Sequence, residues 1–101
     1  MEKLVLFEAN PALIPVDPEE RMKLWLPMLQ LIKADLESGR DKAWGIAPSG
    51  DHGYAITEAD ESEIMIDLAR FSPYVKFKVE TMLSVDECLS ALKKMKEQAA
   101  K

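Results

Sequence analysis

The chain has a single cysteine, Cys88, among its 101 residues. This excludes an intramolecular disulfide framework and is compatible with a reducing compartment. Long hydrophobic runs are also missing, because no stretch approaches the roughly 20 apolar residues that a membrane-spanning helix needs. The first residues lack the basic, apolar and small-residue segments of a secretory signal peptide. We therefore expect a cytoplasmic protein that makes no use of a membrane.

Basic residues are few compared with acidic ones. There are 13 Lys and Arg against 18 Asp and Glu, which gives a net charge of −5. A nucleic-acid-binding protein needs a basic face, and adhesion to anionic lipid needs one too, so neither partner is expected. The one histidine, His52, and the one cysteine lie far apart in sequence and lack the spacing of metal ligands. No metal or cofactor is expected.

Hydrophobic residues make up 48% of the chain, enough to build a core. The length fits a single domain over residues 1–101, without repeats or an internal boundary. Hydrophobic periodicity and turn residues divide this domain into four strands and three helices. The expected strands cover residues 3–9, 42–47, 52–58 and 75–82, and the expected helices cover residues 18–38, 61–71 and 85–101.

The helix boundaries follow from local capping residues. Asp17, Asp60 and Ser84 are each followed three residues later by a glutamate, which is the pattern of a capping box. Gly39 is placed to end the first helix in a left-handed conformation. Pro27 falls inside that helix and should kink it.

Each expected helix has an apolar stripe that we expect to be buried. The second stripe is Ile64, Leu68 and Phe71. The third is Val85, Leu89, Leu92 and Met95, and Cys88 lies on it as a buried, inert thiol. The first is Met22, Trp25, Leu26, Leu29, Ile32 and Leu36, and Leu24, Met28 and Leu31 widen it.

The order of elements predicts an α+β, ferredoxin-like βαββαβ fold with an extra C-terminal helix. Strand 3–9 should be central, parallel to strand 52–58 and antiparallel to strand 75–82. If Val5 and Phe7 meet the helices, Leu4 and Leu6 face away and need a cover. A second copy could supply it, sheet against sheet, in a dimer. The alternatives are the third helix folding over this face, or ordinary exposure.

Two stretches carry a family resemblance. Trp44-Gly45 followed by Gly53-Tyr-Ala-Ile56, and Phe71-Ser-Pro-Tyr-Val-Lys-Phe-Lys-Val79 after an acidic helix, resemble the dimeric α+β barrel superfamily. Within it, the likeness is to muconolactone isomerase-like proteins. The resemblance implies two antiparallel sheets packed into a barrel, in a homodimer or a multiple of dimers. Members include isomerases, cofactor-free monooxygenases, lyases and proteins without known activity.

Glu8 and His52 are the candidate catalytic residues. Glu8 ends an otherwise apolar strand, and a carboxylate in a dry cleft can act as a general base. It could instead form an ion pair with Lys76 or Lys78 across the sheet. His52 has an ordinary pKa suited to proton transfer near neutrality, but it could also be an exposed turn residue.

Asn10, Trp44 and Tyr54 are the candidate substrate-binding residues. Asn10 could donate to a substrate carbonyl, or serve the turn before Pro11. Trp44 could stack on a planar substrate, or pack in the core. Tyr54 shares the face of His52 and could line a cavity mouth, or be a core aromatic.

Two hypotheses on function follow. The first is a small-molecule-binding protein of the isomerase type, which moves a proton next to a carbonyl of a small lactone or aromatic acid. The second is a non-catalytic oligomeric binding module. The convergence of Glu8, His52 and Tyr54 on one cavity would favour the first.

Overall fold

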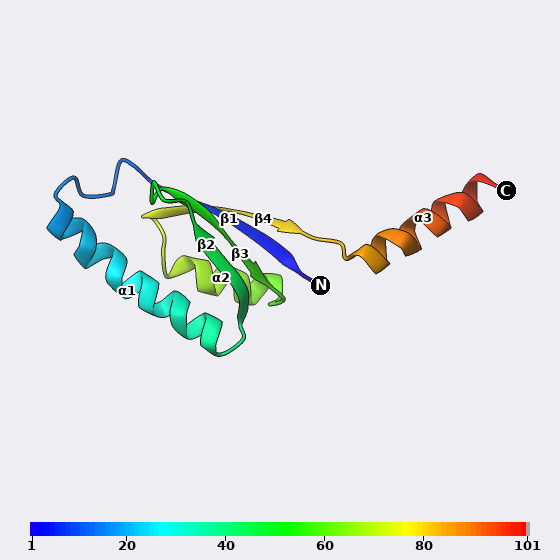
Figure 1. Cartoon of the computed structure of the whole chain (residues 1–101), viewed down its shortest axis with the longest axis horizontal. Coiled ribbons are helices and arrows are strands. Elements are labelled where there is room, and N and C mark those ends of the chain that lie inside the picture. Colours follow the sequence, from blue (N-terminus) through cyan, green and yellow to red (C-terminus); the bar gives the residue numbers. More distant parts are fainter. Residues whose placement is uncertain (101) are drawn as a thin grey trace.

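The structure is a computed structural model that describes residues 1–100. Its order of helices and strands is the predicted one, and the boundaries differ by a residue or two at most of their ends (Figure 1). The elements are β1 (Lys3–Ala9), α1 (Pro18–Glu37), β2 (Asp41–Ile46), β3 (His52–Thr57), α2 (Glu61–Ala69), β4 (Val75–Thr81) and α3 (Val85–Ala99).

The three predicted N-caps form, but among residues 1–100 the complete capping box forms only at the third. The side chains of Asp17, Asp60 and Ser84 each accept the backbone N–H three residues further on, which satisfies a donor that the first turn leaves open. Ser84 forms a complete capping box with Glu87. Gly39 follows α1 with a φ of 80°, a conformation that glycine adopts without steric penalty.

The four strands form one antiparallel sheet in the order β2-β3-β1-β4. The central position of β1 and its antiparallel pairing with β4 are confirmed. The predicted parallel pairing of β1 with β3 is wrong. The crossover through α1 makes β2 run the same way as β1, and the tight hairpin reverses β3, so β3 must oppose β1. The arrangement is compatible with a ferredoxin-like fold.

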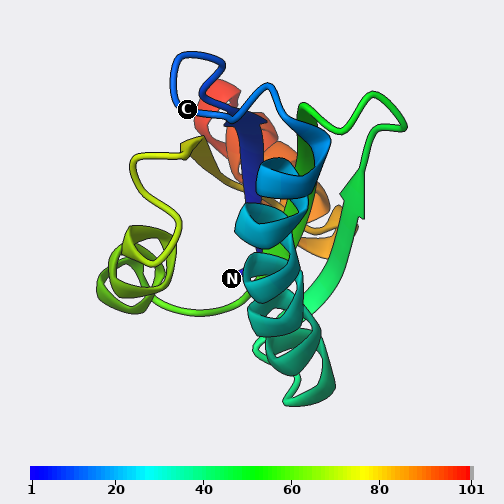
Figure 2. The ribbon, with the colours of Figure 1, turned by 90° about the vertical axis from the view of Figure 1, so that its left-hand side faces the viewer.

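The sheet has one covered and one open face. Helices α1 and α2 both lie against the face that carries Val5 and Phe7 (Figures 1 and 2). Val5 is 4% exposed, whereas Leu6, on the opposite face, is 37% exposed. The predicted division of β1 between the two faces is therefore confirmed. We use "open face" below for the side that carries Leu4, Leu6, Tyr54 and Ile56.

The buried core centres on Met28, Phe71 and Val75. Met28 comes from α1, where it was one of the apolar residues expected to widen the predicted stripe, whereas Met22 and Leu26 of that stripe are exposed. Apolar residues surround much of α1, so their spacing alone does not select the buried side. Pro27 lies within α1, and the helix continues through it to Glu37.

Helix α3 projects away from the rest of the molecule (Figure 1). The prediction that its apolar stripe is buried is wrong, because none of its residues is buried. The prediction for Cys88 is wrong for the same reason, since this residue is exposed. Periodicity shows that a helix has an apolar side, but not what that side contacts. Among residues 1–100, no helix is both long and apolar enough to span a membrane.

Candidate functional site

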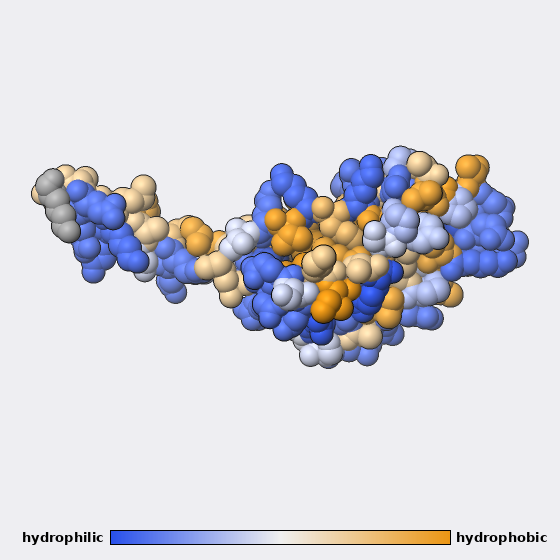
Figure 3. Space-filling model, turned by 180° about the vertical axis from the view of Figure 1, so that it is seen from behind, coloured by the Kyte–Doolittle hydropathy of each residue, from blue (hydrophilic) through white to orange (hydrophobic). Residues whose placement is uncertain are grey.

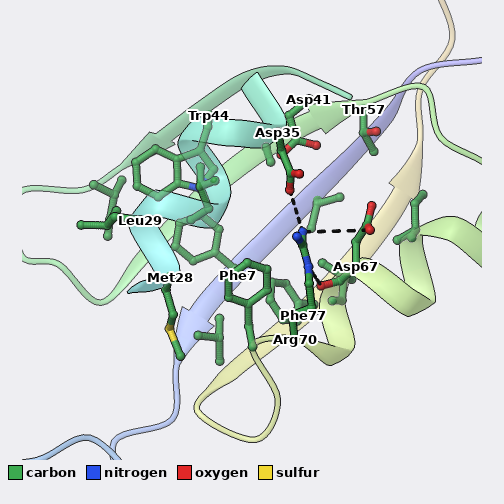
Figure 4. A pocket seen from close by; sticks show the side chains of 18 of the residues that line it. Phe7, Met28, Leu29, Asp35, Asp41, Trp44, Thr57, Asp67, Arg70 and Phe77 are labelled. Atoms are coloured by element: carbon green, nitrogen blue, oxygen red, sulfur yellow. Dashed lines mark hydrogen bonds and ion pairs between the residues drawn. The ribbon is translucent and has the colours of Figure 1, made fainter. Parts of the chain in front are cut away.

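A groove opens between α1 and α2 on the covered face of the sheet. The two helices stand apart, so that the strands between them form its floor (Figure 2). The groove encloses a cavity of about 80 Å³. Most of its walls are apolar, and charged side chains gather at one end (Figure 4). A cavity with an apolar body and a few converging polar groups is typical of a small-molecule site.

Aromatic rings form much of the apolar part. Phe7 stacks on Trp44, with ring centroids 5.7 Å apart and an interplanar angle of 12°. These residues come from β1 and β2, and β3 runs between them at Gly53. A Cβ at Gly53 would lie 2.5 Å from the Phe7 ring, so the missing side chain lets Phe7 lean across β3. Phe71 and Phe77 make an edge-on pair at 6.1 Å.

Two arginines and three aspartates form the charged end. The Arg70 guanidinium donates to Asp35 of α1 at 2.6 Å, and it lies 4.0 Å from Asp67 of α2. Arg40 donates to Asp67 at 2.6 Å. These ion pairs join α1, α2 and the start of β2. The arginines thus pair with Asp35 and Asp67, and Asp41 lies beside the cluster without an ion pair to either (Figure 4).

The surroundings of Asp41 in the groove change its acid–base chemistry. Burial of the side chain raises its pKa above the ordinary value of 3.8, and the negative charges of Asp35 and Asp67 raise it further. Arg70 and Arg40 oppose this shift. The Thr57 hydroxyl donates to the Arg40 carbonyl at 2.9 Å and so fixes the start of β2 next to Asp41. A partly desolvated carboxyl of this kind is suited to exchanging a proton with a ligand.

Glu8, His52 and Tyr54 lie on the open face, on the other side of the sheet from the groove. Glu8 is directly opposite His52 in the β1–β3 register and opposite Lys76 in the β1–β4 register. Within residues 1–100, no ion pair joins Glu8 to Lys76, and Lys78 pairs with Glu80 at 3.2 Å. All three candidates are exposed. The structure therefore brings them to one surface, but not into the enclosed groove.

His52 forms part of a small polar cluster at the β2–β3 turn. Its Nδ1 lies 2.7 Å from the Asp51 carboxylate, which also accepts from the Ser49 hydroxyl at 2.6 Å. The hydrogen bond from Ser49, and then that from His52, lowers the pKa of Asp51. His52 and Tyr54 line a shallow hollow of the open face together with Leu6.

Asn10 and Trp44 lie in different environments. The Asn10 side chain accepts the N–H of Ala12 and donates to the carbonyl of Pro73, each at 3.3 Å. This is the turn chemistry that was the alternative to ligand binding. Trp44 is the one predicted site residue that lines the groove.

The sequence reasoning missed Asp35, Asp41, Asp67 and Arg70. They come from three elements, and nothing in their spacing shows that these elements meet. Gly53 was the available signal, because an isolated glycine in a strand often marks a close approach of another group. Within residues 1–100, His, Cys, Asp and Glu side chains form no group of three that could hold a metal ion.

The fold established here is a small α+β fold with a four-stranded antiparallel sheet. The likeness to muconolactone isomerase-like proteins rests on the two sequence stretches alone. No protein-family model matches the chain, and no curated protein matches it.

Proposed function

We propose that this chain binds a small, largely apolar molecule in the groove and moves a proton next to a carbonyl group of that molecule, as an isomerase-like enzyme does. The observation that supports this most directly is Asp41, a partly buried carboxyl with a raised pKa beside an aromatic cavity. A raised pKa makes the carboxylate a stronger base than an exposed aspartate. Glu8 and His52 serve this reaction less well, because they lie across the sheet from the cavity.

The charge of the groove favours a neutral lactone over an aromatic acid. Three aspartates meet two arginines at its polar end, and both arginines are already paired with carboxylates. A ligand carboxylate placed there would meet Asp41 without a cation of its own, and unpaired like charges in a desolvated site are unfavourable. A neutral carbonyl compound avoids this repulsion, and its ring can pack on Trp44 and Phe7.

Binding can be tested with coumarin, a neutral planar lactone, and coumarin-3-carboxylate as its anionic counterpart. We expect coumarin to quench the fluorescence of the two tryptophans, Trp25 and Trp44, at lower concentration than the anion does. Asp41→Asn should reduce the difference in binding affinity between the two probes, because it removes the carboxylate that repels the anion. Asp51→Asn is the matched control, since Asp51 lies in the turn outside the groove. Equal binding of both probes to the unaltered chain would contradict the assignment of ligand charge.

Proton transfer can be tested separately with angelica lactone in heavy water. A C–H bond next to the carbonyl breaks, its proton passes to the Asp41 carboxylate, its electron pair shifts toward the carbonyl oxygen, and a deuteron returns to carbon. We expect the chain to accelerate this exchange and Asp41→Asn to lose most of the acceleration, by about 100-fold or more. If the Asp41→Asn variant accelerated the exchange as well as the unaltered chain does, Asp41 would not be the group that accepts the proton.

The second candidate function is a non-catalytic oligomeric binding module. The exposed apolar side of α3 and the open face favour an assembly, as a homodimer or a multiple of dimers. The sheet of a second copy could cover the open face, as in a dimeric α+β barrel, or helix α3 of that copy could. Probe binding without any proton exchange would favour this function.

A further inference from the structure

Strand β2 contains one residue more than regular pairing with β3 accommodates. Asp41 lies opposite Thr57, whereas Ala43, two residues later, lies opposite the residue just before Thr57. Strand β2 therefore advances two residues where β3 advances one, and Lys42 is the extra residue of a β-bulge. From Ala43 onward the pairing of β2 with β3 is regular. The bulge thus separates the first residue of β2 from the regular part of the strand.

The bulge determines which side chain of β2 reaches the polar end of the groove. Successive side chains of a regular strand point to opposite faces, so residues three places apart lie on different faces. Asp41 and Trp44 are three places apart, yet both line the groove (Figure 4). Without the bulge, Lys42 would stand opposite Thr57 and face the groove, and Asp41 would face away from it. The bulge therefore puts a carboxyl where regular alternation would put an ammonium group.

Neither charge nor solvation selects Asp41 over Lys42 for this position. The groove already contains the carboxylates of Asp35 and Asp67, which would attract a lysine and which repel the charge of Asp41. Hydrophilic side chains cover much of the body on the side shown in Figure 3, and either residue is readily solvated at such a surface. The bulged pairing therefore needs specific contacts that the regular pairing lacks.

The Thr57 side chain supplies such a contact. Its hydroxyl donates to the carbonyl of Arg40 at 2.9 Å and accepts the N–H of Ala59 at 3.1 Å. Thr57 is 4% exposed, so these hydrogen bonds are largely shielded from water. Regular pairing would move Arg40 one place further from Thr57, and its carbonyl would lose the hydroxyl. It would also displace the Arg40 guanidinium, which donates to Asp67 at 2.6 Å.

The extra residue itself contributes less to the bulged pairing. The Lys42 ammonium lies 3.2 Å from the Glu58 carboxylate, and the two side chains are 49% and 52% exposed. An exposed ion pair of this kind contributes little to stability, because water and salt screen it. The buried hydroxyl of Thr57, which bonds directly to the backbone of β2, therefore has the larger influence on the pairing.

We infer that Thr57 is a positioning residue, whose hydroxyl stabilises the bulge at Lys42 and so places Asp41 in the groove. The catalytic importance of this role rests on the proposed function, in which Asp41 is the base. The placement of Asp41 can be measured on the chain without any ligand. Its failure is therefore distinguishable from a failure to bind the probes or to exchange a proton.

The first test follows the titration of Asp41 by NMR of its side-chain carboxyl carbon. Thr57→Val replaces the hydroxyl by a methyl group, Thr57→Ser keeps the hydroxyl, and Thr81→Val makes the first change at an exposed strand position. We expect the pKa of Asp41 to lie above 3.8 in the unaltered chain, Thr57→Ser and Thr81→Val, and to fall toward 3.8 in Thr57→Val. An unchanged pKa in Thr57→Val, or an equal fall in Thr57→Ser, would overturn the inference.

The second test removes the bulge and separates placement from general stability. Deletion of Lys42 leaves Asp41 two residues before Trp44, so regular alternation alone turns it toward the groove. We expect the deletion variant to keep the raised pKa of Asp41, and Thr57→Val added to it to leave this pKa unchanged. The same comparison decides the matter if Thr57→Val alone does not fold, because the deletion variant no longer needs the bulge. An equal fall of the pKa in both backgrounds, or a double variant that does not fold, would assign the hydroxyl to stability and refute a positioning role.

Discussion

At the scale of single residues, the carboxyl of Asp41 links the fold to the proposed chemistry. The packing of α1, α2 and the start of β2 brings it beside Asp35 and Asp67. Arg40 and Arg70 form ion pairs with those two aspartates and not with Asp41. Its pKa is raised chiefly by burial, so protonation of Asp41 is more favourable in the folded state than in the unfolded chain. The same preference that makes Asp41 a base also makes its ionised form a source of instability.

We therefore expect Asp41→Asn to raise the melting temperature at neutral pH. The folded-state pKa lies above the ordinary 3.8, so the folded state binds more protons than the unfolded one in that interval. The stability contributed by the protonated carboxyl is complete below the ordinary pKa and is lost as pH rises through the folded value. The gain from Asp41→Asn should accordingly fade as the pH falls below about 3.8. Thermal unfolding of both chains, followed by circular dichroism from neutral pH to below pH 3.8, measures this difference in melting temperature.

Asp51 provides a control of opposite sign. Hydrogen bonds from Ser49 and His52 lower its pKa, so its ionised form stabilises the fold above the ordinary value. Asp51→Asn should lower the melting temperature slightly at neutral pH and have no effect in strong acid. If both aspartates changed stability in the same direction, the burial argument for Asp41 would fail.

At the scale of elements, local signals in the sequence predicted more than distant ones. Asp17, Asp60 and Ser84 cap helices through contacts within three residues, which is why the sequence shows them directly. The surroundings of α3 were predicted wrongly because an apolar stripe does not identify its partner. The cluster around Asp41 could not be predicted, since its members meet only after α1, α2 and β2 have packed on one another.

Pro27 is an element-scale case that can be measured. It stands exposed inside α1, where a proline lacks the N–H that the carbonyl of Lys23 would otherwise accept. We expect Pro27→Ala to stabilise the chain by about 2 kcal/mol, because the helix already continues through this position. Urea unfolding measures the free energy of unfolding of this variant and of Pro18→Ala as the control. Pro18→Ala should change it much less, because a proline in the first turn costs the helix no hydrogen bond. Destabilisation by Pro27→Ala would mean that α1 needs the proline's shape.

At the scale of the whole molecule, α3 dominates the shape. The radius of gyration of the chain is 17.6 Å, whereas a compact chain of about 100 residues has about 13 Å. The extents of 64 × 28 × 24 Å show a body with an arm. We expect the Leu89→Glu variant, whose added charge lies on the apolar side of α3, to keep this extended shape in small-angle X-ray scattering. A value near that of a compact chain would show that α3 folds onto its own sheet.

The central place of β1 also governs when the chain can fold during synthesis. β1 is made before both of its neighbours in the sheet, since β3 and β4 begin only at His52 and Val75. Pairings between segments this far apart close long loops, and folding slows as such contacts come to dominate. The growing chain therefore carries an apolar strand without neighbours until β3 and β4 have been added, a state that favours aggregation or binding by a chaperone.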